Sequence, residues 1–172
     1  RKVKFKFVYF LLTFATLVTF IYLGQIPRAF YFDEAAFGYY GHSLLKFGSD
    51  EFGNRLPFYF KSIGDYKYPL YAYLTTLPTL IFGMSVFSAR FISAISGIFI
   101  ILYVFIYAKE NKFLPKSKLL LALSFIFLLS SPWYLLFART AREATLGLAL
   151  VVWGLYFHDK KNFKHVIRKN PG

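Results

Sequence analysis

The chain has no cysteine and few acidic residues: of 172 residues, Asp and Glu number 8, whereas Lys and Arg number 21. Without cysteine it forms no disulfides, and paired CxxC metal sites are excluded. An HExxH helix, a P-loop and a glycine-rich dinucleotide fingerprint are also missing from the sequence, which gives no support for a nucleotide cofactor. Apolar residues, by contrast, are abundant. The 57% of hydrophobic residues and 23% of aromatic residues exceed what an ordinary soluble domain contains.

Several apolar runs approach the roughly 20 residues that a helix needs to cross about 30 Å of hydrocarbon. We therefore expect an all-α protein, a polytopic transmembrane helical bundle that forms a single transmembrane domain over residues 1–172. The first run is longer than the apolar core of a cleavable signal peptide, so we expect it to be retained as an anchor. The predicted spans are 7–26, 87–108, 119–138 and 144–158.

The basic residues are clustered rather than spread over one face. Thirteen of the 21 Lys and Arg residues flank apolar runs, in the segments Arg1 to Lys6, Lys109 to Lys118 and Lys160 to Lys169. This is typical of the positive-inside pattern of membrane proteins and not of a surface that follows nucleic-acid phosphates. We expect a cell-membrane protein with both termini in the cytoplasm and no nucleic-acid partner.

The run 70–82 decides the number of spans. A helix of this length is only about 20 Å long, and Pro78 interrupts it. If the run crossed the membrane, there would be five spans and the two later basic clusters would lie outside. The positive-inside rule therefore favours four spans, with an external loop at 27–86 in which the run 70–82 is re-entrant or interfacial.

The external loop holds five of the eight carboxylates, including the adjacent pair Asp33 and Glu34. These two begin a helical pattern that ends near Gly48 and suits the membrane interface. One interpretation is a helix N-terminus capped by Asp33. The other is that one carboxylate is a general base acting on an incoming hydroxyl or amine. Asp50 and Glu51 lie in a segment with good turn chemistry, and the chain from 48 to 68 is expected to be irregular.

Two further groups of charges could bind an anionic substrate. Lys67, which follows Asp65 and precedes Pro69, is either a snorkelling anchor or the partner of a lipid phosphate. With four spans, the corner that contains Arg139, Arg142 and Glu143 reaches the same side as the external loop. These charges are either positional anchors or a second contact for an anionic ligand.

Four ordered motifs resemble the N-terminal pattern of C-type membrane glycosyltransferases, in particular the prokaryotic relatives of protein O-mannosyltransferases and of the aminoarabinose transferase. The motifs are YFDEAAFGYYGHSLLKFGSDEFG, GDYKYPLYAYLTTLP, FGMSVFSARFISAISG and SPWYLLFARTAREATLGL. Such enzymes are usually several hundred residues long with ten or more spans. The resemblance thus implies that this chain corresponds to their first third or so.

The resemblance implies an inverting enzyme that moves a sugar from a polyprenyl-phosphate donor to an external acceptor. It implies that Asp33 is the catalytic base with Glu34 beside it. It also implies that Asp65, Lys67, Arg139 and Glu143 contact the substrate. The sugar, the acceptor and metal dependence stay open; Asp65 or Glu143 could help to hold a divalent metal. The competing hypotheses are a non-catalytic assembly or lipid-binding subunit and, more weakly, an ion pathway that uses Arg90.

Overall fold

The computed structural model describes residues 5–62, 64–110 and 117–169, with side chains from 7 to 160 within these ranges. There the chain forms seven helices and one two-stranded sheet. Most basic residues that predict the cytoplasmic side, at positions 1–6, 112, 116 and 161–169, lie outside the described side chains. The mostly helical class is confirmed.

The first helix, α1 (Phe5–Phe20), is shorter than the predicted span 7–26. Its regular backbone ends because Tyr22 adopts a positive φ of 52°, after which turns lead through Gly24 to Pro27. Pro27 has no backbone N–H to donate to a helical hydrogen bond, so α1 is not expected to continue through it. The end of α1 therefore exposes several carbonyl oxygens that need partners from elsewhere.

Helix α2 (Phe32–Phe47) confirms the predicted helix and its stop. Gly48 takes the left-handed conformation that glycine favours, with φ 67°, and its N–H donates to the carbonyl of Leu44 at 3.0 Å. The predicted cap is wrong: the N-cap residue is Tyr31, not Asp33. The helix begins one residue before Asp33, and Glu34 accepts the N–H of Tyr31 at 3.1 Å.

The segment predicted to be irregular contains a short antiparallel hairpin, β1 (Phe60–Ser62) and β2 (Asp65–Lys67), in which Phe60 pairs with Lys67. Asp50 confirms the predicted turn, because its carboxylate accepts the N–H groups of Phe52 and Asn54 at 3.0 and 2.8 Å. That carboxylate is buried rather than solvated. Each strand is only three residues long, which is too short to show an alternating pattern in the sequence.

The predicted run 70–82 is a helix, α3 (Pro69–Phe82), which continues through Pro78 and packs against α2 and α4. Helix α4 (Val86–Glu110) covers the predicted span 87–108. The predicted span 119–138 is broken into α5 (Lys118–Ser130) and α6 (Pro132–Arg139), which meet at 56°. Pro132 is the first residue of α6, and a proline at this position favours such a break. Helix α7 (Glu143–Lys169) runs beyond the predicted end at 158.

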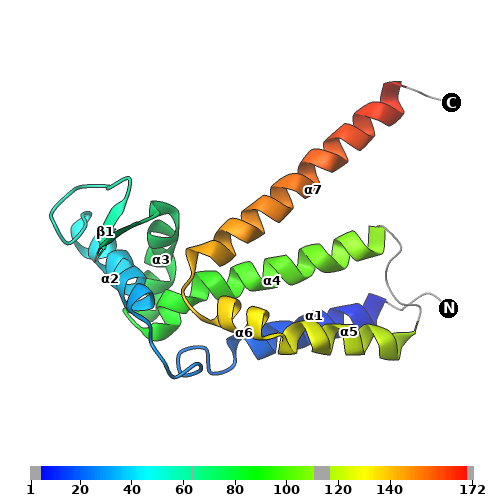
Figure 1. Cartoon of the computed structure of the whole chain (residues 1–172), viewed down its shortest axis with the longest axis horizontal. Helices are drawn as coiled ribbons and strands as arrows, with labels where there is room; N and C mark the ends of the chain where they lie inside the picture. The colour runs from blue at the N-terminus through cyan, green and yellow to red at the C-terminus, as the bar shows by residue number, and fades with distance from the viewer. Residues whose placement is uncertain (1–4, 63, 111–116, 170–172) are drawn as a thin grey trace.

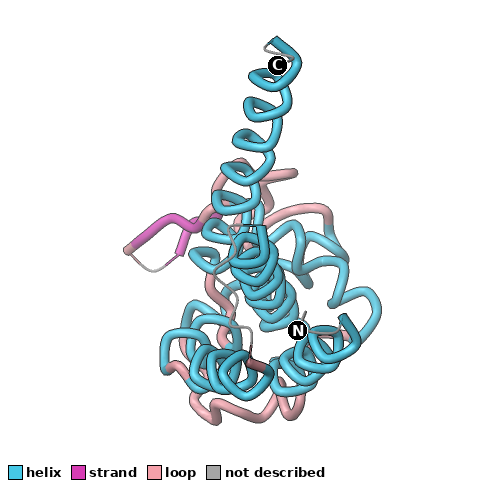
Figure 2. The backbone as a smooth tube through the Cα atoms, turned by 90° about the vertical axis from the view of Figure 1, so that its right-hand side faces the viewer, coloured by secondary structure: helices cyan, strands magenta, loops and turns pink. Residues whose placement is uncertain are grey.

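The elements form a head at one end of a set of long helices (Figure 1). Helices α2 and α3 and the hairpin make up the head, while α1, α4 and α5 run side by side away from it. Figure 2 shows that α7 extends beyond the other helices. One apolar cluster, which includes Phe37 and Tyr71, fills the head. A second cluster, which includes Leu11, Phe105 and Phe125, joins α1, α4 and α5.

Only α4, among the described residues, is by itself long and apolar enough to cross a membrane. The bent pair α5–α6 counts as a second candidate if it forms one span. The apolar part of α1, Phe7–Phe20, is shorter than that length. The described residues thus form a mostly helical structure with one or two candidate membrane spans.

Candidate functional site

Two fully buried charges, Glu34 of α2 and Arg90 of α4, form an ion pair in which both side chains are 0% exposed. Arg90 Nε donates to Glu34 Oε1 at 2.8 Å, and Nη2 donates to Oε2 at 3.1 Å. A bidentate pair of this kind occupies both carboxylate oxygens in one fixed geometry. Each residue depends on the other, because an uncompensated charge buried here would be strongly destabilising.

The same pair connects three segments that are distant in the sequence. Glu34 Oε1 also accepts the backbone N–H of Ala141, between α6 and α7, at 2.8 Å. Arg90 donates to three carbonyl oxygens between α1 and α2, each at 3.0 Å: those of Leu23, Pro27 and Ala29. The sequence predicts a catalytic role for Glu34. A positioning role fits this geometry better, since both of its oxygens are bonded and none of its surface is exposed.

Asp33, the neighbour of Glu34, points the other way and is 38% exposed. Its Oδ1 lies 3.0 Å from Lys67 Nζ. Within the described chain, no bond is made by Asp33 Oδ2, which leaves one carboxylate oxygen open to a ligand. Successive residues of a helix are rotated by about 100°, so one carboxylate of the pair enters the core while the other reaches the surface.

Lys67 lies between two carboxylates. Its Nζ is 2.9 Å from Asp65 Oδ2 as well as 3.0 Å from Asp33, and the lysine side chain is only 12% exposed. The hydrogen bond from Lys67 lowers the pKa of Asp65. The bond to Asp65, with that to Asp33, raises the pKa of Lys67 despite its partial burial. Lys67 is therefore a stable cation that holds Asp33 in place.

The hairpin places Lys67 beside α2. Opposite Lys67 in the register, Phe60 is fully buried and its ring lies 4.6 Å from that of Tyr40 in α2. The Tyr40 hydroxyl donates to the carbonyl of Lys61 at 3.1 Å. These contacts attach the two strands to the helix that carries Asp33, so the ion pair joins surfaces that are already fixed.

Glu143, at the start of α7, faces the same group of charges. It is half-buried, and burial raises the pKa of its carboxyl; the charge of Lys67 acts in the opposite direction, while those of Asp33 and Asp65 add to the rise. Asp33, Asp65 and Lys67, three of the six predicted site residues, are therefore in direct contact, and Glu143 lies close enough for their charges to act on its carboxyl.

Arg139, also predicted to contact the substrate, is directed to the end of α1 instead. Its guanidinium donates to the carbonyls of Val18, Ile21 and Ile26, the last two at 2.6 and 3.3 Å. Arg139 is buried, and its Nε has no partner in the described part of the chain. Its donors cap the irregular end of α1, a role that the spacing of charges could not predict.

Arg142 belongs to the same corner as Arg139, but the resemblance does not imply a role for it. Its guanidinium carbon lies 5.6 Å from the ring centre of Tyr31. No ion pair of Arg142 occurs among the described residues. In the sequence, Arg142 is recognisable only as the second basic residue of this corner. The fold distinguishes the two arginines, because the guanidinium of Arg139 is bonded to backbone carbonyls and, in the portion of the chain that the structure describes, that of Arg142 is not.

The residues described give no support for a metal centre. They contain no group of three or more His, Asp or Glu side chains arranged to hold an ion. Asp65 and Glu143, which could help to bind one, lie with Asp33 around Lys67, whose ammonium already occupies the position between Asp33 and Asp65.

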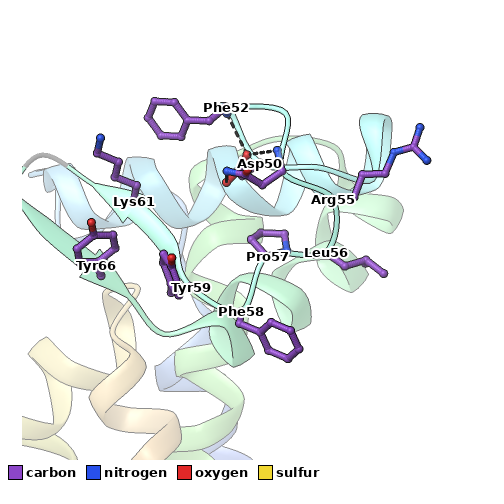
Figure 3. A pocket seen from close by; sticks show the side chains of 10 residues that line it. Asp50, Phe52, Arg55, Leu56, Pro57, Phe58, Tyr59, Lys61 and Tyr66 are labelled. Atoms are coloured by element: carbon purple, nitrogen blue, oxygen red, sulfur yellow. Dashed lines mark hydrogen bonds between the residues drawn. The ribbon is translucent and has the colours of Figure 1, made fainter.

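A separate hollow of about 590 Å³ lies beside the hairpin (Figure 3). Its side chains come from residues 50–66, among them Arg55, Lys61 and Phe58, which is 90% exposed. Lys61 Nζ lies 5.4 Å from the ring centre of Phe52. Figure 3 shows Phe58 and Leu56 directed away from the ribbon. The loop therefore presents aromatic and basic groups to its surroundings.

No protein-family model, curated protein or solved structure matches this chain.

Proposed function

We propose that this protein is a membrane glycosyltransferase of the C type, which moves a sugar from a polyprenyl-phosphate donor to an external acceptor. The observation that carries the proposal is the environment of Asp33. It is a partly exposed carboxylate that Lys67 holds at 3.0 Å and that has one unbonded oxygen in the described chain. Asp33 also follows directly from the capped start of α2, beside the buried Glu34–Arg90 pair.

The proposed reaction is a direct displacement. The acceptor hydroxyl or amine attacks the anomeric carbon as Asp33 accepts its proton, and a new bond from acceptor to sugar forms. The bond between the sugar and the phosphate oxygen breaks, and polyprenyl phosphate leaves with the bonding electron pair. Attack from the opposite side inverts the anomeric configuration. Asp33 is the catalytic residue, and Lys67, Glu34 and Arg90 position it.

The proposed setting is a four-span membrane topology with the head on the external face and both termini in the cytoplasm. The outer faces of the long helices support it, because they carry large exposed apolar side chains such as Phe10, Phe127 and Leu148. The non-helical end of α1 supports it too. Irregular backbone at membrane depth is tolerated where protein covers it, and Arg90 and Arg139 bond its carbonyls.

Replacing Asp33 with asparagine tests the proposal. In proteoliposomes supplied with a radiolabelled polyprenyl-phosphate sugar and a native membrane extract as acceptor, Asp33→Asn should slow transfer by about 10²- to 10⁴-fold. Glu51→Gln, which neutralises an exposed carboxylate of the same loop, should leave transfer unchanged. Transfer at the normal rate by folded Asp33→Asn protein would remove Asp33 from this role.

A second candidate is a non-catalytic membrane assembly or lipid-binding subunit. The exposed aromatic loop around Phe58 favours it, because such groups are suited to contact a partner or the membrane interface. This candidate predicts no transfer by the wild-type protein and no effect of Asp33→Asn. Substituting Phe58 with serine would instead weaken membrane or partner association.

A further inference from the structure

The cations around the candidate site differ in whether their donors are free. Arg90 gives its donors to Glu34 and to three carbonyl oxygens, and Arg139 caps α1. Lys67 is bonded to Asp33 and Asp65. An incoming anion at any of these three positions would have to displace a partner that is already in place.

Lys67 is an unfavourable contact for a phosphoryl anion for a second reason. Three carboxylates, those of Asp33, Asp65 and Glu143, act on it, so a single positive charge is outnumbered there. A phosphoryl anion that approached Lys67 would meet like charges at short range, which opposes binding. The predicted phosphate contact at this lysine therefore conflicts with the local charge balance.

Arg142 has the opposite properties. It is half-buried, it forms no ion pair within the described residues, and its guanidinium lies 5.6 Å from the centre of the Tyr31 ring. Tyr31 occupies the N-cap position of the helix that bears Asp33. A guanidinium against an aromatic ring is held in orientation while its planar N–H donors stay available to a ligand.

The backbone that carries Arg142 is fixed from two other helices. The N–H of Arg142 donates to Ser93 Oγ of α4 at 2.9 Å, and Ser93 Oγ donates back to the carbonyl of Arg142 at 3.2 Å. The preceding residue, Ala141, donates its N–H to Glu34. Ser93 and Glu34 are both fully buried. Arg142 is thus placed relative to Asp33 before any ligand arrives, and preorganised donors of this kind stabilise charge effectively.

We propose that Arg142 is the residue that binds a phosphoryl anion beside Asp33, using its open guanidinium face on Tyr31. This assignment rests on the proposed function and names a contact for the departing phosphate of its donor. A phosphate ester, diester or lipid-linked phosphate shares the chemistry that a planar guanidinium recognises through paired hydrogen bonds. Neither Lys67 nor Arg139 is required as a direct contact.

The test compares ligands that carry or lack phosphate. Protein in phosphatidylcholine nanodiscs is titrated with polyprenyl phosphate, polyprenol, phosphatidylglycerol and inorganic phosphate. Arg142→Gln should weaken binding of polyprenyl phosphate by about 10- to 100-fold, the effect of losing hydrogen bonds to a charged group. Binding of polyprenol should not change, which a merely structural role of Arg142 would not predict. Arg142→Lys, which keeps the charge but loses the planar fork, should fall between the two.

Arg28→Gln is the matched control, because it removes the same charge from an exposed position in the connection between α1 and α2. It should bind polyprenyl phosphate as the wild type does. An equal loss in Arg28→Gln, or no loss in Arg142→Gln, would overturn the assignment. Equal Arg142-dependent binding of inorganic phosphate or phosphatidylglycerol would support phosphoryl recognition and identify its source as free phosphate or bulk lipid.

Transfer assays separate this inference from the proposed function. If Arg142→Gln loses phosphate binding but the wild type transfers no sugar, the glycosyltransferase proposal fails and the anion contact remains. If the wild type transfers sugar and Arg142→Gln has the same KM and kcat, the anion contact fails alone.

Discussion

Asp33 and Glu34 are chemically similar neighbours with opposite surroundings. One is partly exposed and salt-bridged to Lys67 at the surface, and the other is buried against Arg90. A base must meet its substrate, whereas a buried and fully bonded carboxylate is suited to hold segments in register. The buried member fixes the start of α2 through Tyr31 and the α6–α7 corner through Ala141. The orientation of Asp33 is therefore a consequence of the bonds made by Glu34.

Breaking the buried pair should be far more costly than breaking a surface pair. We expect Glu34→Gln and Arg90→Met each to lower the free energy of unfolding by about 3–5 kcal/mol, because each leaves an uncompensated polar or charged partner inside. The double variant should lose less than the sum of the two. Denaturant unfolding followed by circular dichroism measures these differences.

The chain contains its own control for this measurement. Lys160 and Glu110 form an exposed pair at 3.0 Å, with side chains about half exposed. Lys160→Met should change stability by about 1 kcal/mol or less, as is usual for surface pairs. A Glu34→Gln variant as mild as Lys160→Met would show that the buried pair does not hold the site together.

At the level of elements, the sequence predicted the features that depend only on neighbouring residues, such as a helix end and a turn. Gly48 ends α2 as expected, and the turn at Asp50 follows from its side-chain bonds to the backbone. The hairpin was missed because its pairing depends on burial of Phe60 against α2, which no short sequence window contains. The role of Arg139 was missed for a similar reason, since its partners at the end of α1 lie over 100 residues away.

Close helix packing also depends on residues that look unremarkable in the sequence. A Cβ atom added at Gly97 of α4 would lie 2.6 Å from the Cβ of Ala138 in α6. Alanine has no side-chain torsion that could relieve this contact, so the two helices would have to move apart. Gly97 therefore sets the distance between α4 and the helix that leads into the Arg142 corner.

We expect Gly97→Ala to lower the free energy of unfolding by about 1–3 kcal/mol, the usual cost of overpacking. Gly147→Ala in α7 is the matched control, because nothing lies within 4 Å of its added Cβ. It should be neutral or stabilising by up to about 1 kcal/mol, since alanine favours helices. Thermal unfolding of both variants measures the difference, and equal midpoints would contradict the close contact.

For the whole molecule, the proposed function depends on which residues lie at each end of the long helices. The acidic loop, α3 and the corner with Arg142 meet in or beside the head, as Ser93 and Glu34 show by bonding that corner. Basic residues also make contacts at the other end of the long helices, away from the head (Figure 1). Lys118 of α5 lies 5.7 Å from the ring centre of Phe7, and Lys160 pairs with Glu110.

These two ends should lie on opposite sides of a membrane. Helix α4 has 25 residues and is about 37 Å long, enough to cross a hydrocarbon core of about 30 Å.

Because the chain has no cysteine, single cysteines can be introduced and labelled without a background signal from native thiols. An impermeant maleimide applied to intact cells should label Arg28→Cys and Glu51→Cys in the loop. It should label Lys118→Cys and Asp159→Cys only after permeabilisation. Labelling of Asp159→Cys together with Glu51→Cys in intact cells would contradict the four-span topology. The external acceptor site would then lose its basis, although the contacts around Asp33 would be unchanged.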